Sequence, residues 1–114
     1  MKCVLILEDE PFIAMDLTFA FEDKGVEVVS TVSCREAFEA IERNAFDGAV
    51  LDVNLGGGET CEETARELKR RKIPFLLNTG DLNRAGEFLR GMDAPVIQKP
   101  TPAGEVVKAL FAMG

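Results

Sequence analysis

The chain has 114 residues, the usual size of a single domain. Its 13 basic and 20 acidic residues give a net charge of -7, so the basic patch that nucleic-acid binding requires is not expected. Hydrophobic residues make up 46% of the chain, which argues against disorder, and no apolar run approaches the ~20 residues of a membrane span. The absence of histidine excludes Ser-His and Cys-His nucleophile pairs and histidine-bound zinc.

The cysteines and the first residues indicate where the protein resides. Cys3, Cys34 and Cys61 are widely spaced and form no C-x-x-C pair, which is typical of a protein kept reduced in the cytoplasm. Met1 and Lys2 lead directly into an apolar run followed by acids, unlike a signal peptide. We therefore expect a cytoplasmic protein that is neither secreted nor membrane-bound.

Short apolar runs alternate with helix-like segments along the whole chain. The predicted strands are residues 3–7, 26–30, 48–52, 73–78 and 95–98. The predicted helices run from Pro11 to Gly25, from Ser33 onward, and over residues 59–71, 81–90 and 102–113. Such alternation predicts an α/β fold of the (βα)5 type, with a parallel sheet covered by helices on both faces. Residues 1–114 are predicted to form one domain, because the chain ends one helix after the last strand.

Local signals support the first two helices. Pro11 falls in a first turn, where its missing N–H costs nothing, and Gly25 is a common helix-ending residue. Ser33 followed by Glu36 forms a capping box for the second helix. The apolar residues of the first helix are expected to form a broad buried face: Ile13, Ala14, Leu17, Phe19, Ala20 and Phe21.

The only cluster of basic residues is the run Lys-Arg-Arg-Lys at positions 69–72. It falls at the end of a predicted helix, where cations interact favourably with the helix dipole. We interpret it as a solvated helix end rather than a contact for nucleic acid.

Polar residues follow four of the predicted strands: Glu8 and Asp9, Asp52, Thr79, and Lys99. Open α/β sheets bind ligands at the carboxyl ends of their strands. In a sheet of order 2-1-3-4-5, the topological switch point lies between strands one and three, which makes Glu8, Asp9 and Asp52 neighbours. These carboxylates would repel and raise one another's pKa values unless a cation were bound. Mg²⁺ fits, because it takes one or two carboxylates, several waters and a phosphate oxygen.

This combination of residues suits phosphoryl transfer. Asp52 is the candidate acceptor, because a carboxylate can act as a nucleophile and hold a phosphoryl group as a mixed anhydride. Lys99 would neutralise charge that develops during transfer, and the hydroxyl of Thr79 would donate to a phosphoryl oxygen. Asp9 is the expected direct metal ligand and Glu8 a water-mediated one.

Taken singly, each of these residues could equally be a turn residue, a helix-start acid or a surface lysine. The neighbouring acid Glu10 is expected to cap the first helix instead of joining the site. Only the combination at four strand ends indicates a site.

These residues resemble the receiver domain of bacterial two-component response regulators, and the resemblance covers the whole chain. It implies a flavodoxin-like fold with strand order 2-1-3-4-5. It also implies that Asp52 is the phosphoacceptor, and that Glu8, Asp9, Asp52 and the backbone carbonyl of Asn54 hold Mg²⁺.

The resemblance also assigns the remaining site residues. It makes Thr79 the conformational-switch hydroxyl and Lys99 the phosphoryl contact, with a cis bond between Lys99 and Pro100. The family usually has an aromatic residue where this chain has Val96, so the usual rotating-aromatic signal cannot operate. The run Pro-Phe-Leu-Leu-Asn-Thr-Gly at positions 74–80 partly matches a subgroup that also lacks this aromatic.

The resemblance further implies the partners. A sensor histidine kinase, often of the HWE/HisKA2 type in this subgroup, or a histidine phosphotransfer protein would phosphorylate Asp52. The protein would be a signalling phosphoacceptor rather than an enzyme with a separate substrate. A stand-alone receiver would then bind a downstream protein or serve as a phosphate sink, with neither nucleic acid nor membrane as a partner.

Two alternative functions remain open. A Mg-dependent phosphatase with an aspartyl nucleophile generally has a second acid where this chain has Asn54, and it carries a cap domain that this chain lacks. A degenerate receiver that serves only as a binding module is disfavoured by the intact acids and Lys99. A P-loop is excluded, because the three glycines at positions 56–58 are followed by Glu59 and Thr60.

Overall fold

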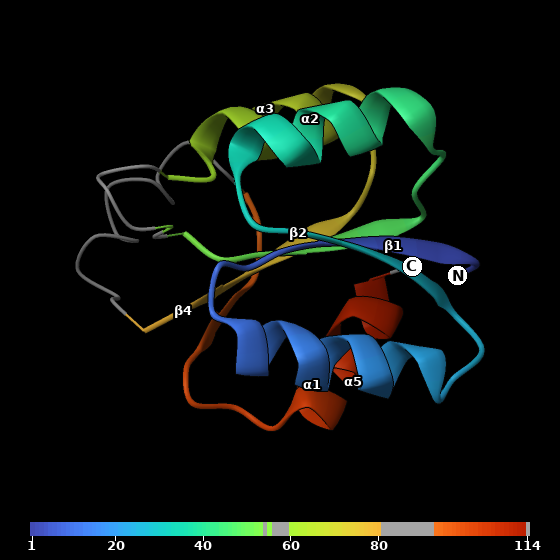
Figure 1. The fold of residues 1–114 in the computed structure, drawn as a ribbon, viewed down its shortest axis with the longest axis vertical. Helices are drawn as coiled ribbons and strands as arrows, with labels where there is room; N and C mark the ends of the chain where they lie inside the picture. Colours follow the sequence, from blue (N-terminus) through green and yellow to red (C-terminus); the bar gives the residue numbers. More distant parts are fainter. Residues whose placement is uncertain (54, 56–59, 81–92, 114) are drawn as a thin grey trace.

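The computed structural model describes residues 1–53, 55, 60–80 and 93–113. In these ranges one five-stranded parallel sheet has the order β2-β1-β3-β4-β5 (Figure 1). The strands are β1 (Cys3–Leu7), β2 (Glu27–Thr31), β3 (Gly48–Leu51), β4 (Phe75–Thr79) and β5 (Val96–Gln98). The described helices are α1 (Pro11–Glu22), α2 (Cys34–Arg43), α3 (Glu62–Arg70) and α5 (Ala103–Met113). The predicted fold and strand order are confirmed, while the helix predicted at 81–90 and the glycines at 56–58 lie outside the described residues.

Helices α2 and α3 cover one face of the sheet, and α1 and α5 cover the other (Figure 1). Successive side chains of a strand point to opposite faces, so a central strand contributes to two cores. In β1, Leu5 and Leu7 join the core under α2 and α3, whereas Val4 and Ile6 join the core under α1 and α5. Burial on both faces explains why the central strands β1 and β3 are apolar without interruption.

Strands β2, β4 and β5 begin one or two residues later than the sequence predicts, and for β2 and β4 a helix end holds the first predicted residue. The N–H of Val26 donates to the carbonyl of Phe21 in α1, at 3.1 Å. The N–H of Ile73 donates to the carbonyl of Leu68 in α3, at 2.9 Å. Neither donor is available to the sheet, so β2 starts at Glu27 and β4 starts at Phe75, two residues after Ile73.

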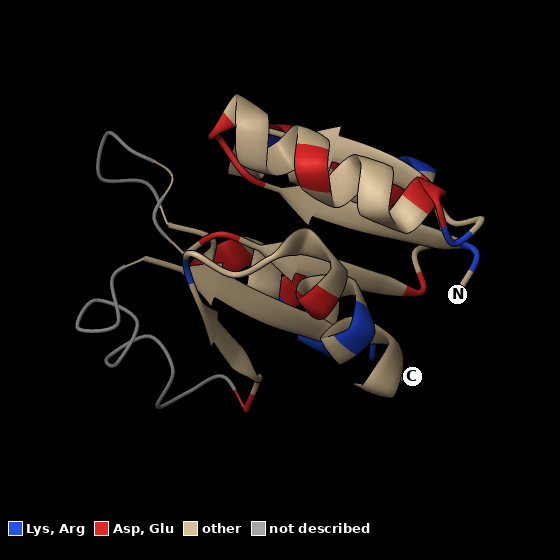
Figure 2. Ribbon diagram, turned by 90° about the horizontal axis from the view of Figure 1, so that it is seen from below, with Lys and Arg blue, Asp and Glu red and all other residues tan. Residues whose placement is uncertain are grey.

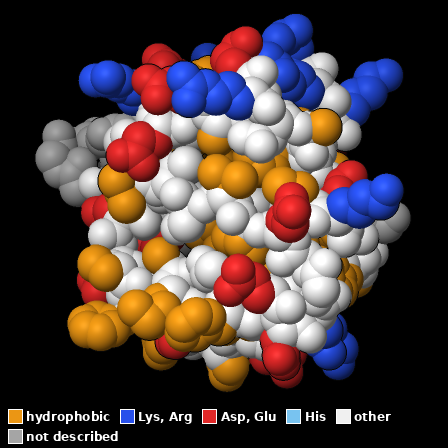
Figure 3. Space-filling view, turned by 45° about the vertical axis from the view of Figure 1, so that its right-hand side comes forward, with side chains coloured by type: hydrophobic (Ala, Val, Ile, Leu, Met, Phe, Trp, Pro, Cys, Tyr) orange, Lys and Arg blue, Asp and Glu red, His pale blue; other side chains and the backbone are white. Residues whose placement is uncertain are grey.

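The prediction of the buried face of α1 is wrong at one position, Phe19. Ala14, Leu17 and Phe21 are buried, but Phe19 is 60% exposed. Phe12, 76% exposed, and Met15, 48% exposed, lie three or four residues apart along the same side of the helix as Phe19. The three define an exposed apolar stripe on α1, and Figure 3 shows hydrophobic side chains gathered at the level of the α1 layer.

The predicted cap of α2 is present. The hydroxyl of Ser33 accepts a hydrogen bond from the N–H of Glu36 at 3.2 Å. The carboxylate of Glu36 in turn accepts from the N–H of Val32 at 3.2 Å, one residue earlier than a standard capping box. Glu10 occupies the corresponding position of α1, but its side chain makes no capping bond, so its expected capping role is wrong.

Replacing Ser33 by alanine is expected to lower the free energy of unfolding by about 1 kcal/mol, because the N–H of Glu36 loses its acceptor. Urea unfolding followed by circular dichroism measures this change. Ser30→Ala on the exposed surface of β2 is the control and should change stability by no more than about 0.5 kcal/mol. Equal effects of the two substitutions would contradict the capping role.

None of the helices in the described ranges has the length and apolarity needed to cross a lipid bilayer.

Candidate functional site

The strands bring the predicted site residues to one edge of the sheet. Glu8 and Asp9 follow β1, Asp52 follows β3, Thr79 ends β4 and Lys99 follows β5. All five strands are parallel, so these positions share the carboxyl-terminal edge. Figure 2 shows acidic positions together with a basic one at this end of the sheet.

Backbone hydrogen bonds extend the sheet by one residue into the site. The N–H of Asp52 donates to the carbonyl of Leu7 at 2.8 Å, which fixes the end of β3 beside β1. The N–H of Lys99 donates to the carbonyl of Thr79 at 2.8 Å, which fixes β5 beside β4. The functional side chains therefore project from backbone that the sheet holds in place.

Three carboxylates converge at the crevice between β1 and β3. One oxygen from each of Glu8, Asp9 and Asp52 lies within 4.8 Å of the others. Glu8 is 2% exposed and Asp52 is 6% exposed, whereas Asp9 is exposed to solvent. Clustered carboxylate oxygens of this kind fit a hard divalent cation such as Mg²⁺, which prefers oxygen ligands and keeps several waters.

Lys99 reaches two of these carboxylates. Its Nζ lies 2.5 Å from Oε1 of Glu8 and 3.2 Å from Oδ2 of Asp52. The other oxygen of Glu8, Oε2, accepts from the N–H of Glu10 at 3.1 Å. The sequence predicts Glu8 as a water-mediated metal ligand. The structure adds a direct ion pair with Lys99, which the sequence does not suggest.

The pKa values of this pair reflect burial and charge together. Burial raises the pKa of Glu8, and the nearby carboxylate of Asp52 raises it further. Lys99 and the N–H of Glu10 oppose these effects, and the resulting pKa is about 7. Burial tends to lower the pKa of Lys99, but Glu8 and Asp52 outweigh it and raise this pKa above its ordinary value. The predicted repulsion among the acids is therefore present, and Lys99 relieves part of it.

Thr79 is fully buried at the end of β4. Val96, which stands where the family has an aromatic, pairs with Leu77 across β4 and β5 and is half-buried. The bond between Lys99 and Pro100 is cis, as the resemblance implied. Asn54, the predicted carbonyl ligand, lies outside the described residues.

The family model of the response regulator receiver domain matches residues 4–111. The chain belongs to the receiver domain family. Receiver domains are signalling phosphoacceptors that typically bind Mg²⁺ at an acidic cluster, and Glu8, Asp9 and Asp52 form such a cluster here.

Two curated proteins are similar to the chain over most of its length. The phyllosphere-induced regulator PhyR of Methylorubrum extorquens is 32% identical over 108 residues, which cover 92% of this chain and 37% of PhyR. Nodulation protein W of Bradyrhizobium diazoefficiens is 29% identical over 112 residues, covering 96% of this chain and 49% of that protein. The chain thus spans less than half the length of the curated relatives that it matches.

One solved structure matches this chain over nearly the full length of both proteins. The solution structure of SdrG from Sphingomonas melonis Fr1 has a TM-score of 0.82 and 37% sequence identity, covering 98% of this chain and 94% of SdrG. At 37% identity, the two chains are similar in sequence as well as in fold.

Proposed function

We propose that Asp52 accepts a phosphoryl group from a phosphohistidine of a partner kinase or phosphotransfer protein, in a reaction that requires Mg²⁺. The observation that carries this proposal is the position of Lys99. Its ammonium lies 3.2 Å from Oδ2 of Asp52, beside a carboxylate cluster that can hold a cation.

The transfer forms one bond and breaks another. A carboxylate oxygen of Asp52 attacks phosphorus, an O–P bond forms as the N–P bond breaks, and the electron pair returns to the imidazole of the donor. The ammonium of Lys99 stabilises negative charge on the equatorial phosphoryl oxygens. Magnesium held by Glu8, Asp9, Asp52 and the carbonyl of Asn54 would supply further positive charge at those oxygens.

Thr79 is the proposed switch residue. It ends β4, whose neighbour β3 leads to Asp52, so its hydroxyl can donate to a phosphoryl group on that side chain. Phosphorylation then biases the receiver toward the state in which this bond forms. The relay beyond Thr79 must differ from that of most receivers, because Val96 lacks the aromatic ring that would move.

The apolar stripe on α1 is the proposed docking surface for the phosphodonor. Phe12, Met15 and Phe19 are exposed, and α1 begins two residues after Asp9. A helical partner packed on this stripe would therefore place its phosphohistidine close to the crevice. Exposed aromatic and methionine side chains are typical of such protein contacts. A kinase of the HWE/HisKA2 type remains a prediction from the run at 74–80.

A single-domain receiver that binds a target protein or serves as a phosphate sink is also part of the proposal. The match covers 94% of the SdrG chain, so a chain of about this length can form the fold. The cytoplasmic location remains a prediction from the cysteine pattern.

Phosphorylation of Asp52 is tested with acetyl phosphate and MgCl2, with intact mass spectrometry as the readout. We expect one added phosphoryl group on the wild-type protein and none on Asp52→Asn. Asp23→Asn, an exposed carboxylate after α1, is the matched control and should be phosphorylated like the wild type. Equal labelling of Asp52→Asn and the wild type would overturn the proposal. A protein that neither binds Mg²⁺ in a titration nor accepts phosphate would instead be a binding module.

A further inference from the structure

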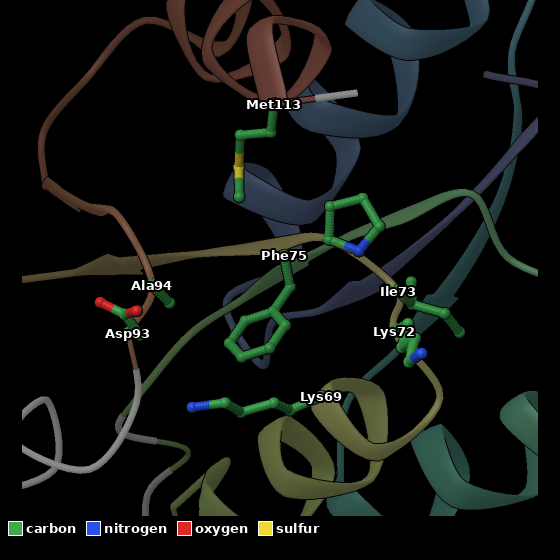
Figure 4. Close-up of a pocket in the computed structure, with 8 residues that line it drawn as sticks. Lys69, Lys72, Ile73, Phe75, Asp93, Ala94 and Met113 are labelled. Atoms are coloured by element: carbon green, nitrogen blue, oxygen red, sulfur yellow. The ribbon is translucent and has the colours of Figure 1, made fainter.

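A hollow lies at the opposite end of the sheet from Asp52. It has a volume of about 480 Å³ and lies where β4 begins and α3 and α5 end (Figure 4). This volume falls within the range of small-molecule pockets in proteins, roughly 300–1,000 Å³. The lining residues are Lys69, Lys72, Ile73, Pro74, Phe75, Asp93, Ala94 and Met113.

The walls of this hollow are mainly apolar. Figure 4 shows the ring of Phe75 directed into it, with Met113 above the ring and the long side chain of Lys69 extending beneath it. Ile73 and Ala94 line the sides. Met113 is 36% exposed and Phe75 6%, so a planar or aliphatic group would pack mainly against the thioether of Met113 and cover the exposed part of the Phe75 ring.

The rim carries two lysines that form no ion pair within the part of the chain that the structure describes. In the basic run 69–72, Arg70 and Arg71 form ion pairs with Glu67, at 2.5 Å and 2.6 Å. Lys69 and Lys72 form no ion pair with any acidic side chain of the described ranges. Both of these lysines line the hollow, although the chain as a whole has a net charge of -7.

Asp93 is the only acid among the described lining residues. Two ammonium groups and one carboxylate leave a net charge of one positive unit around the hollow. A ligand with one negative charge complements this balance better than a dianion, which the carboxylate of Asp93 would repel.

We propose that this hollow is a binding site for a small organic monoanion with an apolar body. The ammonium groups of Lys69 and Lys72, which Figure 4 shows on opposite sides of the hollow, attract the carboxylate of the ligand, and its body packs against Phe75 and Met113. Such a site gives a role to two lysines of the basic run 69–72, which belongs neither to the phosphorylation crevice nor to the α1 stripe. Its residues lie at the end of the strands opposite to Asp52, and binding there does not rest on the proposed phosphorylation.

The site is tested by titrating the ¹⁵N-labelled protein with 2-naphthoate and following amide shifts by NMR. We expect saturable shifts at Lys69, Ile73, Phe75 and Met113, with a dissociation constant of about 1 mM or tighter. The neutral analogue 2-naphthalenemethanol should bind at least about fivefold more weakly, because it cannot pair with the lysines. Acetate, which has the charge without the apolar body, should give no saturable shift.

Two variants and a control identify the groups that bind. Lys69→Gln and Lys72→Gln should each weaken naphthoate binding by up to about fivefold, and the double variant more. Lys24→Gln removes an exposed lysine after α1 and should bind like the wild type. Equal binding of the neutral analogue, or wild-type affinity in the double variant, would overturn the proposal. An acidic peptide that binds more tightly than naphthoate at the same residues would also overturn it, in favour of a protein partner.

Discussion

Replacing Lys99 by methionine is expected to slow phosphorylation of Asp52 by roughly 100-fold. Methionine keeps most of the length of the lysine side chain but removes the ammonium that lies 3.2 Å from Oδ2 of Asp52. A preorganised charge acts strongly here, because both Asp52 and its neighbour Glu8 are buried. The rate is measured with acetyl phosphate in saturating Mg²⁺, by quenching samples over time for mass spectrometry.

Loss of folding has to be separated from loss of this charge. Removing the ammonium leaves the buried carboxylate of Glu8 without its ion pair, which destabilises the folded state at neutral pH. Circular dichroism at the temperature of the assay establishes the folded fraction. Lys108→Met on the exposed side of α5 is the control and should react like the wild type. A folded Lys99→Met protein with a rate within about threefold of the wild type would exclude an electrostatic role for Lys99.

The sequence predicts the sheet well because its central strands are buried on both faces. Uninterrupted apolar runs such as residues 3–7, when helical segments separate them, are typical of strands in a covered parallel sheet. Once the strands are parallel, their ends must share an edge, so the positions of Asp52, Thr79 and Lys99 follow from topology. The strand boundaries are less predictable, because they depend on hydrogen bonds such as the one from Ile73 back to α3.

The side of α1 that faces the solvent cannot be predicted in the same way. Apolar residues lie around most of this helix, so periodicity alone does not separate buried positions from exposed ones. The pattern therefore predicts a buried Phe19, although this residue belongs to the exposed stripe with Phe12 and Met15. The helix has more apolar residues than one buried face requires. This excess is the sequence feature that indicates a contact surface.

The ion pair between Glu8 and Lys99 is not predictable from the sequence either, although both residues are predicted to belong to the site. They are 91 residues apart in the chain, and their residue types indicate separate roles, one toward the metal and one toward the phosphoryl group. Their pairing depends on side-chain distances that topology does not specify. It matters because it couples the charge of the metal site to that of the phosphoryl site, so that changing either group alters the pKa of the other.

In the absence of Mg²⁺, the protein should lose stability as the pH rises from about 4.5 to 7, the interval between the ordinary and the folded-state pKa of Glu8. The folded state holds a proton on Glu8 across this interval, whereas the unfolded chain has already released it. Proton release on unfolding means that the free energy of unfolding falls with rising pH, by on the order of 2–3 kcal/mol. The raised pKa of Lys99 does not contribute to this change, because Lys99 is protonated in both states throughout the interval. Urea unfolding at several pH values measures the slope.

Glu8→Gln isolates this effect, because glutamine keeps the shape of the side chain and does not titrate. The variant should show little decrease in stability over the same interval, whereas Glu10→Gln, which removes an exposed acid beside the site, should retain the decrease. Adding Mg²⁺ to the wild type at pH 7.5 should restore stability, by about 2.7 kcal/mol at a concentration of 100 Kd. The cation favours the ionised carboxylates that repel one another without it. A wild-type stability that rises with pH over this interval would mean that Glu8 is ionised in the folded state at acidic pH, with Lys99 compensating fully for its burial.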